Sequence, residues 1–297
     1  MPHAVYMLMN IPHWLARLGA NEDLNFLLTN RIPRAWATRV MARLSRIRQP
    51  WVFRLLLMIW QRFTPLDLSD AADVPYRSVH EIFTRRLRPG ARPLDLRRTV
   101  FTSPCDALVG ACGVVADGQV LQAKGMPYEI NELLGDAALA RSMNGGTYVT
   151  LRLTAAMYHH FHAPWDCIVE DVRYHSGDTW NVNPIALKRI ERLFCRNERA
   201  VLRCRFGDRP GTFVLVPVAA ILVSSLRFTW LPSPLREAGR GLSVLPCSHH
   251  ASKGEELGWF EHGSTVIVLV PPGFHLAPGL RDGSAIRMGQ ALLVASA

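Results

Sequence analysis

The sequence KGEELGWFEHGSTVIVLVPPG, residues 253–273, lies near the C-terminus and contains the motif that decides how the rest of the chain is interpreted. Gly263, Ser264 and Thr265 come directly before a run of β-branched and aliphatic side chains, residues 266–270, which predicts a buried strand. The simplest interpretation is a tight turn that leads into this strand. The alternative is chemical, because the hydroxyl of Ser264 can attack the carbonyl of Gly263 if the backbone is held strained. These residues alone leave both interpretations open.

Length and composition allow one large domain or two smaller ones with a substantial core. The chain has 297 residues, of which 49% are hydrophobic and 20% are charged, and its net charge is +10. Residues 1–100 carry 16 arginines and no lysine against seven acidic residues, so the positive charge belongs to the N-terminal third. Six cysteines without a C-x-x-C pair predict reduced, intracellular thiols. The first residues, MPHAVYMLMNIPHW, lack a charged region and a cleavage site, so no secretory signal is expected.

The N-terminal third predicts a helical, membrane-associating region. Residues 35–48 place apolar side chains on one helical face and Arg39, Arg43 and Arg46 on another. Residues 51–63 are apolar and bracketed by tryptophans, but too short for the roughly 20 residues that span a bilayer. Such helices lie in the membrane interface, where arginine attracts anionic lipid. The alternative is a helical pair packed on the domain. Nucleic acid is not an expected partner, because no binding motif accompanies the charge.

After a polar linker at residues 67–73 and a short helix at 79–87, the sequence predicts a β-rich domain. Short strands are expected at residues 119–123, 147–153, 213–223, 266–270 and 291–295. The uncharged segment 211–226 is expected to form two buried strands joined near Pro217, since it is too short to span a membrane. The predicted fold class is therefore α+β. It has a helical region over residues 1–66 and a barrel-like or sandwich-like domain over residues 67–297.

Three histidines lie within four positions in MYHHFHAP, residues 157–164. On a strand His160 and His162 would share a face, whereas on a helical turn His159 and His162 would. Imidazoles can bind a metal or act as acids and bases near neutral pH. The spacing matches no known zinc motif, so no metal is predicted, although CSHH, residues 247–250, offers conceivable further ligands.

Several segments occur together in the order of a known family. They are IFTRRLRPGARPLD, SPCDALVGACG, LQAKGMPYEINELLG, YHHFHAP, NPIALKRIERLFCRNERAVL and the stretch quoted first, all between residues 82 and 273. With these blocks the chain resembles phosphatidylserine decarboxylase, a self-cleaving, pyruvoyl-dependent enzyme. The Gly-Ser pair and the strand behind it form the most diagnostic block.

The resemblance implies a role for each residue at a matching position. Ser264 matches the processing serine, and Asp106 and His162 match the other members of the Asp-His-Ser triad that drives self-cleavage. His159 matches the histidine implicated in decarboxylation. A pairing of His159 with His162 requires a turn at this point of the chain rather than a straight strand.

The implied chemistry begins with attack of Ser264 on the Gly263 carbonyl, with His162 as base, which converts the peptide to an ester. β-Elimination of the ester then leaves a large chain, residues 1–263, and a small chain, residues 264–297, that begins with dehydroalanine. Hydrolysis of this residue releases ammonia and gives the pyruvoyl cofactor. This group would form a Schiff base with phosphatidylserine and accept the electrons released with CO2, giving phosphatidylethanolamine. The implied partners are an anionic membrane and the two chains of one precursor, and a homodimer is a further possibility. The implied location is peripheral, at the cytoplasmic face of the cell membrane.

Five residues depart from the family's pattern. Ala107 replaces a glycine, Met157 an aspartate, His160 an arginine, His262 a leucine and Glu129 a serine. Because Met157 and His160 flank the functional histidines, two alternatives stay open. One is a pyruvoyl-dependent decarboxylase of another amino-acid head group, and the other is a non-processed, membrane-bound scaffold of the same fold.

Overall fold

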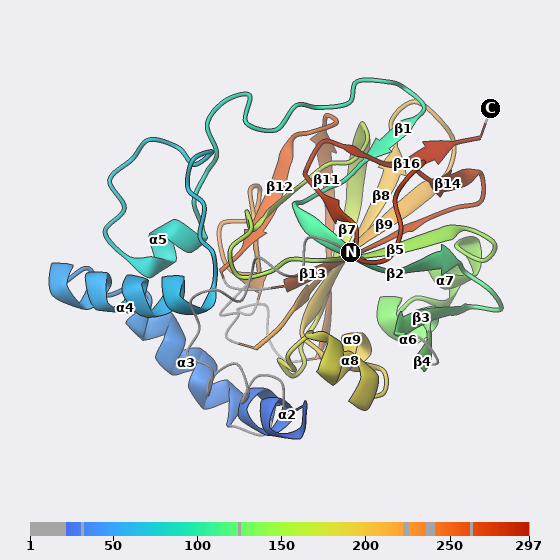
Figure 1. The fold of residues 1–297 in the computed structure, drawn as a ribbon. Coiled ribbons are helices and arrows are strands. Elements are labelled where there is room, and N and C mark those ends of the chain that lie inside the picture. The colour runs from blue at the N-terminus through green and yellow to red at the C-terminus, as the bar shows by residue number, and fades with distance from the viewer. Residues whose placement is uncertain are drawn as a thin grey trace.

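The computed structural model describes residues 22–30, 33–123, 126–221, 226–235, 241–261 and 264–296. Within these ranges the protein has a β-rich α+β fold, in which four helices precede a set of antiparallel sheets (Figure 1). Gly263 and His262 lie outside the described residues.

The N-terminal helices lie at the periphery of the sheets (Figure 1). They are α2 (Glu22–Asn30), α3 (Arg34–Leu44), α4 (Pro50–Phe63) and α5 (Val79–Phe83). The predicted helices over 35–48 and 51–63 are confirmed as helices, although α3 ends four residues early and α5 stops at Phe83. Proline suits the start of α4, because its missing N–H has no partner in the first helical turn. Among the described helices, none is both long and apolar enough to cross a membrane.

The central element is an eight-stranded antiparallel sheet with the order β11-β7-β8-β9-β13-β5-β2-β15. Its strands are β11 (Leu242–Ala251), β7 (Cys167–His175), β8 (Arg199–Phe206), β9 (Thr212–Ala219), β13 (Ser264–Val270), β5 (Thr147–Arg152), β2 (Ala107–Val114) and β15 (Ala285–Ile286). The sheet is open, with β11 and β15 at its edges, so the described strands do not close into a barrel. The predicted strand at 266–270 is confirmed, and it begins two residues earlier, at Ser264.

Three smaller sheets complete the described strands. They are β1 (Val100–Thr102) with β16 (Ala291–Ala295) and β14 (Phe274–Leu276), then β10 (Leu226–Phe228) with β12 (Glu256–Phe260) and β6 (His160–His162), and the pair β3 (Gln119–Ala123) and β4 (Met126–Glu129). The remaining helices are α6 (Ile130–Leu134), α7 (Ala137–Ser142), α8 (Pro184–Arg189) and α9 (Leu193–Arg196).

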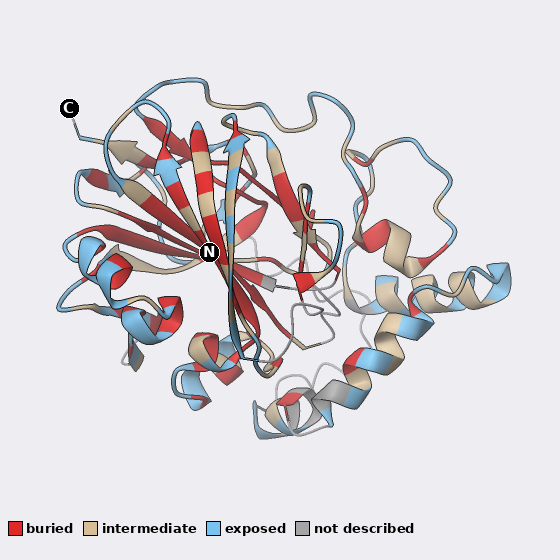
Figure 2. Cartoon of the chain, turned by 180° about the vertical axis from the view of Figure 1, so that it is seen from behind, coloured by how far each residue is buried: buried red, intermediate tan, exposed pale blue. Residues whose placement is uncertain are grey.

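The central strands of the large sheet are buried on both faces, and they are mostly red in Figure 2. Along β13, Val266 and Val268 belong to a core that contains the Phe101, Phe206 and Phe274 rings, whereas the alternate residues of β13 pack into a second core with helices α6 and α9. A strand buried on both faces has a continuous rather than an alternating hydrophobic pattern. This explains the uninterrupted run that follows Ser264.

One strand prediction is wrong. The segment 211–226 does not turn at Pro217, because β9 continues through this proline to Ala219 and β10 begins only at Leu226. The N–H of Ala219 points toward β8, where it donates to the Glu198 carbonyl, so the N–H that Pro217 lacks is missing from the same side of the strand. The pairing of Pro217 with Val266 on β13 is kept, and this strand loses one ladder bond without bending.

Candidate active site

The first residues of β13 and of β2 lie at the same end of the large sheet, where its strands begin or end. Both strands run antiparallel to β5, which lies between them, and Arg152 at the end of β5 is paired with Leu108 on one side and Thr265 on the other. Asp106 comes two residues before Leu108, and Ser264 comes one residue before Thr265. At a spacing of about 4.8 Å per strand, the two backbones are separated by roughly 10 Å. The topology thus brings two of the predicted site residues to the same end of the sheet.

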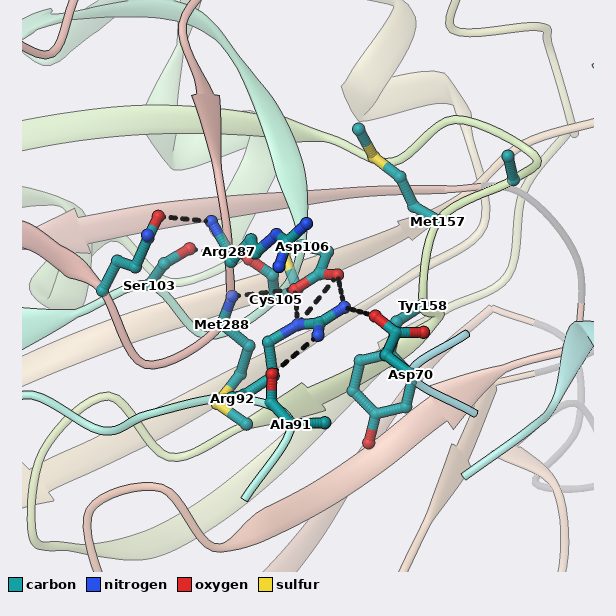
Figure 3. A network of polar contacts seen from close by, with 12 residues as sticks. Asp70, Ala91, Arg92, Ser103, Cys105, Asp106, Met157, Tyr158, Arg287 and Met288 are labelled. Atoms are coloured by element: carbon teal, nitrogen blue, oxygen red, sulfur yellow. Dashed lines mark hydrogen bonds and ion pairs between the residues drawn. The ribbon is translucent and has the colours of Figure 1, made fainter. Parts of the chain in front are cut away.

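Asp106 is held by an arginine that the sequence analysis did not single out (Figure 3). The Arg92 guanidinium donates to both oxygens of this buried carboxylate, with Nε–Oδ1 at 2.9 Å and Nη2–Oδ2 at 2.5 Å, and the Met288 N–H donates at 2.9 Å. Arg92 also forms an ion pair with Asp70 at 2.7 Å. Burial lowers the pKa of Arg92, but the hydrogen bonds and charges of Asp106 and Asp70 outweigh it and raise that pKa overall.

His162 is oriented by a main-chain carbonyl. Its Nδ1 lies 3.0 Å from the Gly254 oxygen, which can only accept, so Nδ1 carries the proton. The other ring nitrogen, Nε2, then accepts from the Tyr158 hydroxyl at 3.0 Å. Burial lowers the pKa of His162 to about 4, against the opposing effects of Gly254 and Glu256. His162 is therefore a neutral imidazole with its basic nitrogen directed toward Tyr158.

Gly254 can hold this carbonyl in place because it lacks a side chain. Its φ of +86° lies in the left-handed region, and a Cβ atom there would come within 2.7 Å of the Leu94 side chain. The backbone of His162 is fixed as well, since its N–H donates to the Pro104 carbonyl at 2.8 Å. Pro104 lies two residues before Asp106. The turn that carries the aspartate is thus bonded to the strand that carries the histidine, although no hydrogen bond joins the two side chains within the described structure.

The histidine cluster forms a strand, so the predicted turn that would pair His159 with His162 is wrong. In β6, His160 and His162 share a face, and the Tyr158 ring stacks on His160 with centroids 4.8 Å apart and planes 5° from parallel. The ring of His159 packs instead on Phe83 of α5 at 3.9 Å between centroids. The β12 strand imposes this arrangement by pairing with β6. The two predicted site histidines consequently belong to different surroundings.

His160 stands where the family's arginine was expected, and it has a carboxylate partner. Its Nδ1 lies 3.0 Å from Glu256 Oε1, its Nε2 lies 3.2 Å from the Thr84 carbonyl, and its ring stacks near Trp259. Burial raises the pKa of Glu256, but its hydrogen bond to His160 and the neighbouring charges outweigh this effect and lower that pKa. Glu256 therefore supplies negative charge close to both His160 and His162.

Two cavities adjoin these groups. A cavity of about 220 Å³ is lined by His162, Tyr158, Arg92 and Glu256. A larger cavity, of about 520 Å³, lies between helices α3 to α5 and the ends of β5 and β9, with a mainly apolar lining that includes Phe83. Because His159 packs on Phe83, this histidine belongs to the side of the larger cavity, and His162 to the smaller one.

The segment that precedes the predicted cleavage site is anchored to the N-terminal helices. Glu261 is the last described residue before it, and its carboxylate lies 2.8 Å from Arg46, between α3 and α4, and 3.6 Å from Arg227 of β10. On the other side of the site, Ser264 pairs with Ala219 of β9. The chain is thus fixed by an ion pair before the site and by a strand ladder after it.

Sequence reasoning missed three groups. Arg92 lies within the block IFTRRLRPGARPLD, and Tyr158 directly precedes the histidines, so both could have been proposed as partners of the triad. The carbonyl of Gly254 could not have been found, because a main-chain acceptor leaves no residue-type signal. Among the described residues, no group of three or more histidines, cysteines or acidic residues could hold a metal ion.

Comparison with known proteins bears on this geometry. Residues 79–294 match the family described as phosphatidylserine decarboxylase. The phosphatidylserine decarboxylase proenzyme of Anaeromyxobacter sp. (strain K) is 37% identical over 281 residues, covering 92% of this chain and 98% of the relative. The proenzyme of the same name from Yersinia enterocolitica is 32% identical over 283 residues, covering 91% and 96%. These matches define the class as that of the decarboxylases. The chain belongs to the phosphatidylserine decarboxylase family.

Proposed function

We propose that the protein converts phosphatidylserine to phosphatidylethanolamine and CO2, using a pyruvoyl group formed from Ser264 after cleavage of the Gly263–Ser264 bond. The observation that carries the proposal is that the site residues meet at one end of the large sheet. Asp106 and the start of β13 flank the end of β5, and the backbone of His162 is hydrogen-bonded to the turn that carries Asp106. The family membership and the proenzyme names of the relatives support the same reaction.

In the cleavage step, Ser264 Oγ attacks the Gly263 carbonyl carbon while its proton passes to a base. The C–N bond between Gly263 and Ser264 then breaks as the Ser264 nitrogen takes up that proton, which leaves an ester. His162 Nε2 is suited to accept the hydroxyl proton of Ser264 once the Tyr158 hydroxyl has ceased to donate to it, because this nitrogen is unprotonated and the Nδ1–H bond to Gly254 stabilises the ring that has gained a charge. The negative charges of Glu256 and Asp106 also favour the protonated ring. We propose that Asp106 acts through this field and through the Pro104 turn, with Arg92 fixing its carboxylate.

The decarboxylation step needs an electron-accepting carbonyl, which a pyruvoyl group supplies when present. Such a group fits the start of β13, because the backbone there is held by Ala219 and Ala220 lines the apolar cavity. This cavity, of about 520 Å³, has the chemistry to hold a lipid acyl chain, and its mainly apolar walls favour loss of charge from a carboxylate. His159, buried beside Phe83, is proposed to return the proton to the decarboxylated carbon.

We further propose peripheral attachment at the cytoplasmic face of the cell membrane. Helix α4 exposes Trp51, Leu55, Met58 and Ile59, and these positions share one helical face. An exposed stripe of this kind, with arginines beside it, suits a membrane interface containing anionic lipid. The same helices border the apolar cavity, so a lipid would pass from the membrane to the site without crossing water.

Denaturing mass spectrometry of the purified protein tests the proposal. We expect two masses, for residues 1–263 and 264–297, with the second blocked at its N-terminus, and conversion of phosphatidylserine in vesicles. Ser264→Ala should leave one intact chain without activity. His159→Ala should split normally but lose at least about 100-fold in decarboxylation, as expected for loss of a general acid.

Each failure has its own meaning. A wild-type chain that stays intact under all conditions would contradict the enzyme reading and favour the scaffold alternative. Two chains in the Ser264→Ala variant would contradict the choice of nucleophile. A processed protein that leaves phosphatidylserine unchanged would favour another head group.

A further inference from the structure

A half-buried arginine without a partner among the described residues lies beside the strand that begins with Ser264. Arg152 ends β5 directly opposite Thr265 of β13, and its side chain lines the 520 Å³ cavity. Throughout the part of the chain that the structure describes, no hydrogen bond or ion pair engages its guanidinium group. Burial lowers the pKa of Arg152, and the charge of Asp282 opposes this effect without a direct contact.

Thr265, on the neighbouring strand β13, is a second polar residue whose side chain lacks a partner among the described residues. This side chain is fully buried, and within the described ranges its hydroxyl has no hydrogen-bond partner. Residues directly opposite each other on antiparallel strands share a face of the sheet, with Cβ atoms about 5 Å apart. Arg152 and Thr265 therefore lie side by side on one face of the sheet, where Arg152 lines the mainly apolar cavity.

A fully buried hydroxyl such as that of Thr265 is normally paired, and a half-buried cation beside apolar side chains is stabilised by an anionic partner. An anion that enters with a ligand would satisfy both groups at once. We propose that Arg152, assisted by Thr265, binds the phosphodiester of the lipid substrate while its acyl chain occupies the apolar cavity. This inference rests on the proposed function and names the group that recognises the substrate.

A phosphodiester and a carboxylate are both anions of the head group, and the reaction distinguishes between them. Decarboxylation removes charge from the carboxylate, so a guanidinium bound there would stabilise the substrate more than the transition state and slow the reaction. The phosphodiester keeps its charge throughout. Binding it lowers KM without opposing the chemistry, and its oxygens match the planar donors of arginine.

The position of Arg152 suits this role. Phe83, on which His159 packs, lines the same cavity, so the phosphate anchor and the proposed proton donor border one space. Ser264 precedes Thr265 in the chain, which places the reacting end of β13 one residue from the anchor. A phosphodiester held by Arg152 would direct the serine amine toward this strand end.

Kinetics of two substrates test the proposal. With dihexanoylphosphatidylserine, Arg152→Met should raise KM by about 10- to 100-fold, the range for one charged hydrogen-bonding group, and leave kcat within about threefold. Arg152→Lys, which keeps the charge, should fall between. With O-octanoylserine, which has the amine and carboxylate but no phosphate, wild type and Arg152→Met should have equal kcat/KM. Arg205→Met, which removes an exposed ion pair with Glu170, is the matched control.

An unchanged KM for dihexanoylphosphatidylserine in Arg152→Met would overturn the inference. So would an equal loss on both substrates, since that result assigns Arg152 to the carboxylate. Binding of dihexanoylphosphatidic acid, measured by calorimetry on the processed protein, gives a readout without turnover and should weaken by the same factor. If wild type binds this probe through Arg152 but leaves phosphatidylserine unchanged, the proposed function fails while the anion site stands.

Discussion

The basicity of His162 is determined by its burial and by the two groups that its ring nitrogens contact. A lowered pKa of about 4 means that the neutral, proton-accepting ring persists well below the ordinary value of 6.5. The same lowering weakens the fold as pH falls from 6.5 toward 4, because the unfolded chain binds a proton there that the folded chain does not.

We therefore expect the rate of self-cleavage to stay nearly constant from pH 8 down to about pH 5 and to fall only as pH approaches the lowered pKa. Precursor made by cell-free translation, followed by gel electrophoresis at each pH, gives the rate, and circular dichroism verifies that the chain is folded. A rate that halves near pH 6.5 would show that His162 titrates normally or is not the base.

The pair of Arg92 and Asp106 differs in burial from that of Arg97 and Asp95, although both are bidentate. Arg92 and Asp106 have side chains 5% and 9% exposed, against 69% and 20% for Arg97 and Asp95. Arg92→Met leaves a buried carboxylate uncompensated and should lower the free energy of unfolding by about 3–5 kcal/mol. Arg97→Met should lower the free energy of unfolding much less, because water screens an exposed ion pair.

Urea denaturation measures both losses, in a Ser264→Ala background that keeps the chain in one piece. Equal losses in the two variants would contradict the importance of burial.

The Asp106 site illustrates what residue types reveal. The sequence indicated the aspartate and both histidines, but not that Asp106 would bind Arg92 and that His162 would bind a main-chain carbonyl. Such partner choices depend on packing between segments far apart in the chain.

At the scale of elements, helices α3 and α4 and the strands β3, β5, β13 and β16 were predictable, because local periodicity and turn residues determine them. The errors arose where a neighbour overrides local preference. Pro217 continues a strand because β13 pairs with it, and β6 is a strand because β12 lies alongside. Neither neighbour is close in sequence.

Helix α4 makes a testable contribution through its exposed face. Met58 is 61% exposed on this face. Met58→Asp should reduce binding to phosphatidylserine-containing vesicles by about tenfold or more. The substitution removes apolar area that the membrane would bury and adds a negative charge that the anionic lipid repels. Leu96→Asp is the matched control, since Leu96 is 79% exposed in the loop before β1. Vesicle sedimentation measures both. Equal binding of Met58→Asp and wild type would exclude this face as the docking surface.

At the scale of the whole molecule, β13 has a neighbour on each side, β9 and β5, that would belong to the large chain after cleavage. The small chain, residues 264–297, also contributes β14 and β16, and β16 pairs with β1. We expect the processed chains to co-elute in gel filtration under native conditions and to separate only in denaturant. Loss of the small chain in native buffer would contradict a cut directly before β13.

Because β13 lies in the middle of the sheet, the cleaved protein cannot refold by the route that the precursor follows. The sheet assembles while all of its strands belong to one chain, so the closure of β13 between β9 and β5 is intramolecular. After the cut, the same insertion would require two separate molecules to meet and one of them to enter the middle of a completed sheet, at an entropic cost that depends on concentration. Heat inactivation should therefore be irreversible, and the working lifetime of the enzyme is set by the rate of its first unfolding.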